Sequence, residues 1–170
     1  LATYPDSRIF GDIGCYTLGA LPPFKALASG VDMGASITMA KGAADAGLFP
    51  SVAVIGDSTF THSGMTGLLD AVNDKSNITV VISDNLTTGM TGGQDSAGTN
   101  KLEAICLGLG VEPEHVRVVV PLPKNMPEIT RILKEEIDYP GVSVIIPRRE
   151  CIQTAARHAR EAKKLKEENK

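Results

Sequence analysis

The sequence predicts an α/β fold: a mostly parallel sheet of about five or six strands with helices on both faces. β-rich runs alternate with helical patterns along most of the chain, as in parallel sheets whose strands are joined by helices. The runs SVAVI, ITVVIS and VRVVV lack polar alternation, which indicates strands covered on both faces. A length of 170 residues with 42% hydrophobic residues is enough for one core and short for two.

We expect strands at residues 8–13, 51–55, 77–83, 115–120 and 141–146, and helices at residues 33–46, 63–74, 101–109 and 125–137. The first helical segment is rich in Gly and Ala, the second has apolar residues near i, i+3 and i+4, and the other two are amphipathic. The tail CIQTAARHAREAKKLKEENK has the pattern of a helix that becomes fully polar. The predicted organisation is one domain over residues 1–150 and a polar C-terminal helix or linker over residues 151–170.

Charge and composition exclude several functional classes. A net charge of −3 without a basic stripe argues against nucleic acid as a partner. No run of about 18 apolar residues is present, so we expect no membrane association. Three widely spaced cysteines, at positions 15, 106 and 151, argue against a disulfide framework and favour a reducing, cytoplasmic setting. The chain begins with Leu1 and has no signal peptide, so we expect it to be a piece of a longer protein.

Two neighbouring predicted strands each end in a polar side chain. Asp57 follows the run VAVIG, and Asn85 follows the run ITVVISD. Because the carboxyl ends of parallel strands meet at one edge of a sheet, we expect these two side chains to lie close together. Carboxylate and carboxamide oxygens suit Mg²⁺, which usually completes its octahedron with water and phosphate oxygens. A diphosphate is therefore the ligand that this edge predicts.

Each of these residues has a purely structural alternative. Asp and Asn after strands commonly cap helices or form Asx turns, and Gly-Asp-Ser alone is a frequent turn. The functional interpretation depends on the order of events along the chain, which runs strand, Gly-Asp, helix, strand, Asn and then the glycine-rich segment TTGMTGGQ. Small residues in such a segment let backbone amides approach a ligand closely.

Four motifs in this order resemble the thiamine-binding region of the 2-oxoacid:ferredoxin oxidoreductases. They are GDIGC at 11–15, MGASITMAKG at 33–42, GDSTFTHSG at 56–64 and DNLTTGMTGGQ at 84–94. Within that family, the segments GDIGCYTLGALPPF, MGASI and GDSTFTHSG resemble the C-terminal thiamine domain of the indolepyruvate ferredoxin oxidoreductase α subunit. The resemblance extends from about residue 10 to residue 148 and implies the thiamine-diphosphate-binding fold.

The resemblance also implies a set of site residues. Asp57, the side chain of Asn85 and the backbone carbonyl of Thr87 would bind Mg²⁺. The residues that would bind or border thiamine diphosphate are Gly14, Cys15, Met33, Gly34, Gly56, Asp57, Ser58, Thr59, Asn85, Thr87, Thr88 and Gly89.

Two of the implied roles are catalytic. Cys15 would border the reactive part of the cofactor, with simple packing as the alternative. His62 would serve near the substrate as donor or acid, with a polar residue at a helix start as the alternative. His115 and His158 are expected at the surface, away from this edge.

The activity that the resemblance implies is oxidative decarboxylation of 2-oxo acids, with indolepyruvate or another aryl pyruvate as substrate. The products would be acyl-CoA and electrons passed to ferredoxin. Iron–sulfur clusters and coenzyme A would belong to the full enzyme and not to this chain. Its implied partners are a thiamine pyrimidine-binding domain, a γ/β-type subunit and ferredoxin, in a homodimer or higher oligomer.

Three alternatives remain open on the sequence. A non-oxidative thiamine-dependent decarboxylase or synthase subunit would use the same cofactor. The run VIGDSTF also resembles the nucleophile turn of Gly-Asp-Ser esterases, with Ser58 as the nucleophile, although no Asp-x-x-His pair follows it. The third alternative is a non-catalytic α/β binding module.

Overall fold

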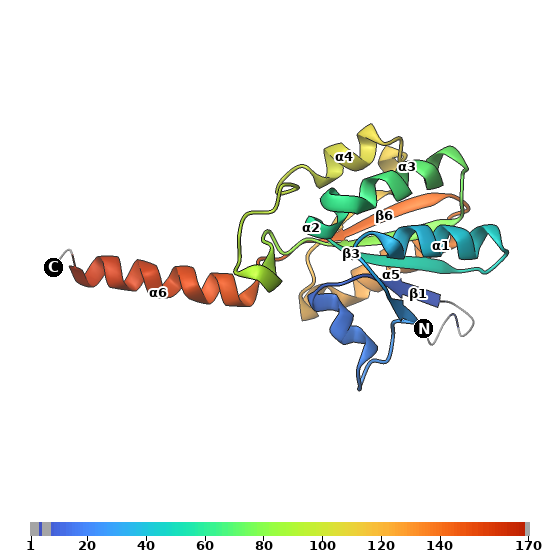
Figure 1. Cartoon of the computed structure of the whole chain (residues 1–170). Helices are drawn as coiled ribbons and strands as arrows, with labels where there is room; N and C mark the ends of the chain where they lie inside the picture. The colour runs from blue at the N-terminus through green and yellow to red at the C-terminus, as the bar shows by residue number, and fades with distance from the viewer. Residues whose placement is uncertain (1–3, 5–7, 169–170) are drawn as a thin grey trace.

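The computed structural model describes Tyr4 and residues 8–168, which fold around one six-stranded parallel sheet (Figure 1). The sheet order is β2-β1-β3-β4-β6-β5, and every neighbouring pair of strands is parallel. The strands are β1 (Arg8–Gly11), β2 (Ser29–Gly30), β3 (Ser51–Gly56), β4 (Ile78–Ser83), β5 (Val116–Val119) and β6 (Val142–Pro147). The predicted α/β class and parallel sheet are confirmed.

Helices cover both faces of this sheet. The longer ones are α1 (Ala35–Asp45), α3 (Met65–Asn73), α4 (Leu102–Gly108), α5 (Met126–Asp138) and α6 (Ile152–Glu168). Short helical segments are η1 (Cys15–Ala20), α2 (Asp57–Thr59), η2 (Phe60–Gly64), η3 (Gly89–Thr91), η4 (Pro113–His115) and η5 (Pro123–Asn125). Helices α1, α3 and α4 share one hydrophobic core with the sheet, and α5 forms a second core on the other face.

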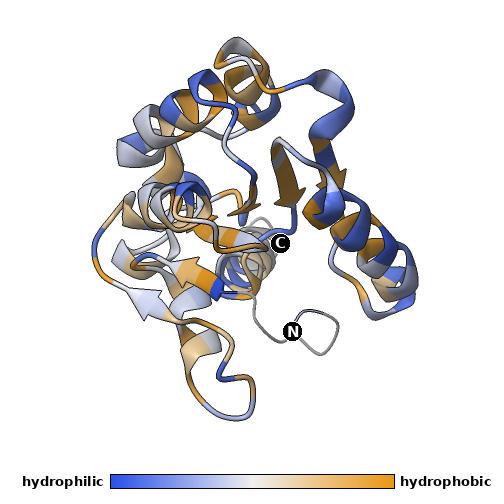
Figure 2. Cartoon of the chain, turned by 90° about the vertical axis from the view of Figure 1, so that its right-hand side faces the viewer, coloured by the Kyte–Doolittle hydropathy of each residue, from blue (hydrophilic) through white to orange (hydrophobic). Residues whose placement is uncertain are grey.

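The strands supply both cores because successive side chains point to opposite faces. On β6, Val144 and Ile146 belong to the larger core, whereas Ile145 between them packs against α5. Figure 2 shows the consequence in hydropathy: the strands are largely hydrophobic, and the helices mix hydrophobic and hydrophilic residues. Among the described residues, no helix combines the length and the apolar character that a membrane span needs.

The main differences from the predicted elements lie at the carboxyl edge of the sheet. Strand β1 ends at Gly11 because the next side chain, Asp12, turns away to bond the start of α1. Strand β2 has two residues, too few to leave a pattern in the sequence. The second helix begins at Asp57, directly after β3, and contains the π-helical turn η2. Its first residues, Asp57, Ser58 and Thr59, have weak helix propensity, which explains why the predicted start at residue 63 was too late.

His115 differs from the surface position expected for it. Its side chain is 23% exposed, Nδ1 lies 2.8 Å from the buried carboxylate of Glu136, and its ring stacks on Tyr139. The side chain of His158 lies outside the described residues. Helix α6 extends away from the body of the domain (Figure 1), but its first turns contact the loop after β4. Those contacts involve the cofactor-binding segment discussed below.

The core assignment predicts a large stability difference between two adjacent leucines of α3. Leu68 is fully buried, whereas Leu69 is 41% exposed. Leu68→Ala should lower the free energy of unfolding by about 2–5 kcal/mol, because it removes buried methyl groups and leaves a cavity. Leu69→Ala should change it by about 0.5 kcal/mol or less. Urea unfolding of both variants measures the difference, and equal losses would contradict this packing.

Candidate cofactor-binding site

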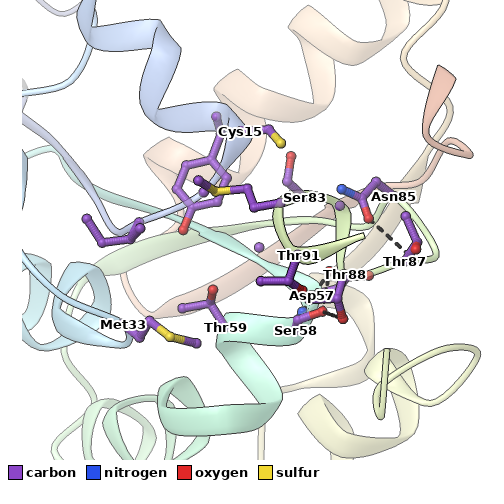
Figure 3. Close-up of a pocket in the computed structure, with 16 residues that line it drawn as sticks. Cys15, Met33, Asp57, Ser58, Thr59, Ser83, Asn85, Thr87, Thr88 and Thr91 are labelled. Carbon is purple, nitrogen blue, oxygen red and sulfur yellow. Dashed lines mark hydrogen bonds between the residues drawn. The ribbon is translucent and has the colours of Figure 1, made fainter. Parts of the chain in front are cut away.

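A cavity of about 260 Å³ opens at the carboxyl edge of the sheet (Figure 3). Open α/β sheets bind ligands at this edge, outside the carboxyl ends of the strands. The residues that line it are Ile13, Gly14, Cys15, Tyr16, Met33, Gly56, Asp57, Ser58, Thr59, Ser83, Asn85, Thr87, Thr88, Gly89, Met90 and Thr91. All the predicted cofactor-binding residues except Gly34 are in this set.

The register of the central strands explains why Asp57 and Asn85 come together. Gly56 at the end of β3 pairs with Ser83 at the end of β4. Asp57 comes directly after Gly56, and Asn85 comes two positions after Ser83. Both side chains therefore reach the same cavity, as the sequence predicted.

Asp57 is a buried carboxylate with one oxygen unsatisfied. The residue is 3% exposed. Its Oδ1 accepts hydrogen bonds from the Ser58 amide at 2.6 Å and from the Ser58 hydroxyl at 3.3 Å. The other oxygen, Oδ2, is buried and has no hydrogen-bond partner. Burial, together with the nearby charge of Asp84, raises the pKa of Asp57 to about 6. A buried anionic oxygen without a partner is the arrangement that a bound cation would complete.

Asp84, the other acidic residue at this edge, is already paired. Its carboxylate accepts a hydrogen bond from Arg148 Nε, and the same guanidinium donates to both carboxylate oxygens of Glu103, at 2.9 and 2.7 Å. Backbone bonds fix this segment too, because the Asp84 amide donates to Pro147 and the Asp84 carbonyl accepts from Arg149. Asp84 is therefore held in the framework by its ion pair with Arg148 and is not among the residues that line the cavity.

The loop after β4 is folded back on itself at the cavity (Figure 3). Asn85 Oδ1 accepts a hydrogen bond from the Thr87 amide at 3.1 Å, which is an Asx turn. The Thr88 amide donates to the Gln94 carbonyl at 2.7 Å, and the Thr87 hydroxyl donates to that carbonyl at 2.9 Å. The hydroxyls of Ser58 and Thr88 lie 2.9 Å apart, so this loop is linked directly to the turn after β3.

The structural alternative for Asn85, an Asx turn, is present, and its role as a metal ligand stays a prediction. Its side chain makes the Asx turn and also lines the cavity. An amide oxygen has two lone pairs, so accepting the Thr87 amide leaves a second lone pair for a cation.

Gly34 is not among the lining residues, but its contacts hold its neighbour Met33 in place. Its amide donates to Asp12 Oδ2 at 3.2 Å, while the Ser36 amide and hydroxyl donate to the two oxygens of the same carboxylate. Gly34 has a φ of 96°, and a Cβ there would lie 2.7 Å from the Ser63 carbonyl oxygen. The carbonyl of Met33 accepts from the Ser63 hydroxyl at 2.7 Å. These bonds fix Met33 at the cavity.

The two candidate catalytic residues are placed differently. Cys15 lines the cavity and is exposed, opposite the glycine-rich loop, and a Cβ on Gly89 would lie 3.8 Å from its sulfur. His62 is exposed on the π-helical turn and is not among the lining residues. Its catalytic role remains a prediction.

Several residues at the site were not predicted. Tyr16 and Ile13 are neighbours of the predicted Gly14 and Cys15, so their place in the motif was the available signal. Ser83 precedes the two polar residues at the end of β4. The buried carboxylate of Asp12 lies within the motif GDIGC and could have been found because it follows a strand, as Asp57 does.

Comparison with known proteins assigns the family. Residues 12–146 match the model of the C-terminal TPP binding domain of thiamine pyrophosphate enzymes. The chain belongs to this family. Thiamine diphosphate is therefore the cofactor that its domain type binds, and the predicted thiamine-diphosphate-binding domain is confirmed.

Curated relatives of this TPP-binding domain include indolepyruvate oxidoreductase subunits IorA. The subunit from Archaeoglobus fulgidus is 38% identical over 86% of this chain, and that from Pyrococcus horikoshii is 34% identical over 88%. The resemblance drawn from the four motifs is confirmed by these matches. The chain spans about a quarter of the length of these relatives, at 25% and 26%.

Solved structures share the fold at low sequence identity. A 2-oxoglutarate:ferredoxin oxidoreductase from Magnetococcus marinus superimposes with a TM-score of 0.67 at 20% identity, over 86% of this chain and 55% of that one. A thiamine diphosphate-dependent 4-hydroxybenzoylformate decarboxylase from Rhodococcus jostii RHA1 gives a TM-score of 0.60 at 22% identity, over 86% and 30%. These likenesses support the fold of the TPP-binding domain.

The raised pKa of Asp57 predicts a pH-dependent stability in metal-free buffer. Because the folded-state pKa of about 6 lies above the ordinary value of 3.8, the folded protein keeps a proton between these two pH values that the unfolded chain has lost. The free energy of unfolding should therefore fall as pH rises through this window, by at most about 3 kcal/mol. Asp57→Asn should remove that part of the fall.

Urea unfolding in chelator, from pH 4 to pH 7, measures this prediction. The difference between wild type and Asp57→Asn isolates Asp57 from the other titrating groups. Parallel pH profiles for the two proteins would show that Asp57 titrates normally in the folded state.

Proposed function

We propose that this chain is the diphosphate- and Mg²⁺-binding domain of a 2-oxoacid:ferredoxin oxidoreductase that acts on an aryl pyruvate such as indolepyruvate. The observation that carries the metal site is the buried, unpartnered Oδ2 of Asp57 beside Asn85 and Thr87. The identity to IorA subunits supports the choice of substrate class.

The donor set suits a hard cation with few protein ligands. Asp57 would supply a carboxylate oxygen, Asn85 its amide oxygen and Thr87 its backbone carbonyl. The described residues contain no cluster of three or more His, Cys, Asp or Glu side chains that could hold a metal by themselves. Phosphate oxygens and water would then complete the octahedron, which makes cation and diphosphate binding interdependent.

The other lining residues form a polar part and a sulfur-containing part of the cavity. The hydroxyls of Ser58, Thr59 and Thr88, with Gly56 and Gly89, form the polar wall suited to diphosphate oxygens. Cys15 and Met33 would border the reactive end. When bound, thiamine diphosphate supplies the chemistry of 2-oxo acid decarboxylation, and the protein supplies binding and orientation. His62, exposed outside the lining residues, would act as donor or acid toward the substrate in the assembled enzyme.

Other parts of the full protein would supply the rest of the reaction. The described cysteines are all free, and Cys106 is buried in the core, so they do not form the four-thiolate set that an iron–sulfur cluster requires. We propose that the clusters, coenzyme A binding and the pyrimidine-binding domain lie in other segments or in a γ/β-type subunit, and that ferredoxin accepts the electrons. The assembly would be a cytoplasmic homodimer or higher oligomer.

The contacts of Ser58 do not favour the esterase alternative. Its hydroxyl lies 3.3 Å from Asp57 Oδ1 and 2.9 Å from the Thr88 hydroxyl. Within the described part of the chain, no histidine is among the hydrogen-bond partners of Ser58. A serine nucleophile needs such a base within hydrogen-bond reach.

The metal site predicts a graded loss of cofactor affinity. Asp57→Ala removes the anionic ligand of the proposed metal site, so it should weaken Mg²⁺-dependent binding of thiamine diphosphate strongly. Loss of a residue that only supports a metal ligand costs roughly 10–100-fold in affinity, and the loss in Asp57→Ala should be larger. Asn85→Ala should weaken it less. Isothermal titration calorimetry measures both affinities. Asp70→Ala, which changes an exposed carboxylate of α3, is the matched control and should bind as wild type does.

If Asp57→Ala bound thiamine diphosphate as tightly as wild type in Mg²⁺, this assignment of the metal site would be wrong.

The incomplete set of reaction components predicts that the isolated chain binds its cofactor without turning over 2-oxo acids. The test is reduction of methyl viologen by purified chain with indolepyruvate, Mg²⁺, thiamine diphosphate and coenzyme A. No reduction above the rate without protein is expected, because no cluster is present to carry electrons. Robust turnover would show that this chain contains the missing components.

A further inference from the structure

Tyr16 occupies a position in the site that neither the motifs nor the metal site explain. It lies in the first turn of η1, and its ring fits between two glycines on different segments. A Cβ on Gly14 would lie 2.3 Å from Tyr16 Cε1, and a Cβ on Gly56 would lie 3.2 Å from the same atom. The first distance excludes a side chain without movement of the ring. Both glycines therefore leave room for this ring beside the turn that carries Asp57.

The hydroxyl of Tyr16 is buried and has no hydrogen-bond partner of acceptable geometry. The Thr59 hydroxyl lies nearby, because the Cβ position of Gly56 is 3.2 Å from Tyr16 Cε1 and 3.9 Å from Thr59 Oγ1. Burial raises the pKa of Tyr16 to about 12, against the opposing effect of the Gly56 amide and the Thr59 hydroxyl. The hydroxyl is therefore neutral at physiological pH and keeps its proton. Leaving a buried hydroxyl unpaired is costly, so such a group calls for an explanation.

The chemistry of these groups fixes the direction of the hydrogen bonds they can form. A backbone amide can only donate, so the Gly56 amide can pair with Tyr16 only through the oxygen lone pairs. The proton of Tyr16 can then be donated to the nearby oxygen of Thr59, because a hydroxyl can accept as well as donate. If Thr59 accepts that proton, its own proton must point elsewhere. Thr59 lines the cavity, where diphosphate oxygens accept hydrogen bonds and donate none.

We propose that Tyr16 is a positioning residue that orients the Thr59 hydroxyl as a hydrogen-bond donor to the cofactor diphosphate. In this arrangement the Gly56 amide donates to the Tyr16 oxygen, and the Tyr16 hydroxyl donates to the Thr59 oxygen. The Thr59 hydroxyl then donates to a phosphate oxygen when the ligand binds. Hydrogen bonds at such sites are often long in the free protein and shorten in the complex. The inference rests on the proposed diphosphate site of the preceding subsection.

This role predicts opposite effects of one substitution on stability and on binding. Tyr16→Phe removes the unpaired buried hydroxyl and keeps the ring, so the Tm of the ligand-free protein should stay unchanged or rise. The same substitution should weaken thiamine diphosphate binding in Mg²⁺ by roughly twofold to tenfold, the value of one hydrogen bond. A purely structural tyrosine would lower the Tm and affect binding only through folding.

A double-mutant cycle tests whether Tyr16 acts through Thr59. The variants are Tyr16→Phe, Thr59→Val and the double variant, with affinities from calorimetry and Tm values from ligand-free samples. Thr59→Val should weaken binding, and the double variant should bind no more weakly than Thr59→Val alone. Thr59→Ser, which keeps the hydroxyl, should retain the wild-type affinity. Tyr139→Phe, which removes a hydroxyl bonded to Glu112 in another part of the domain, is the matched control.

The outcomes separate this inference from the proposed function. Wild-type affinity in Tyr16→Phe, or additive losses in the double variant, overturns the role of Tyr16 while the cofactor site stands. A wild-type chain that binds no thiamine diphosphate in Mg²⁺ overturns both.

Discussion

The site depends on one electrostatic constraint, the burial of the Asp57 carboxylate with Oδ2 unpaired. A desolvated carboxylate is unfavourable unless a proton or a cation compensates it. Burial therefore raises the pKa of Asp57 to about 6 and holds the group where a cation would lower its energy. The end of β3 fixes the position of this carboxylate, so the sheet itself sets where a cation would bind.

The surrounding charges are arranged so that this one oxygen remains available. Asp84 is neutralised by Arg148, which also binds Glu103, and Asp12 is fully engaged with the first turn of α1. Asp12, Asp57 and Asp84 each directly follow the carboxyl end of a strand. Of these three, only Asp57 has a buried side-chain oxygen without a hydrogen-bond partner. Asp12 and Asp84 are paired and do not line the cavity, so Asp57 is the carboxylate that we propose as the cation ligand.

The contacts of α6 extend this framework to the C-terminal segment. The Cys151 amide donates to the Asn85 carbonyl, and Arg157 donates to the carbonyls of Gly92 and Gly93. The segment expected to be a polar helix or linker therefore contacts both ends of the loop that follows β4, at Asn85 and at Gly92 and Gly93. We propose that the functional domain includes the first turns of this helix, beyond the boundary drawn at residue 150.

Strand patterns and strand-end residues were enough to predict the parallel sheet and the meeting of Asp57 with Asn85. Both follow from local periodicity and from the geometry of parallel strands. The burial of the Tyr16 hydroxyl and the pairing of Asp84 with Arg148 could not be predicted, because they join positions far apart in the sequence. Propensity also misplaced the start of the helix at Asp57, where burial of Phe60 outweighs the weak helix formers around it.

We expect the protonated Asp57 carboxyl group to release its proton when a cation binds. Infrared difference spectroscopy at pH 6, recorded on adding Mg²⁺ and thiamine diphosphate to metal-free protein, observes that carboxyl group directly. Loss of a protonated-carboxyl band is expected in wild type, with no such loss in Asp57→Asn. A wild-type protein that binds the cofactor with no change in its protonated-carboxyl bands would contradict it.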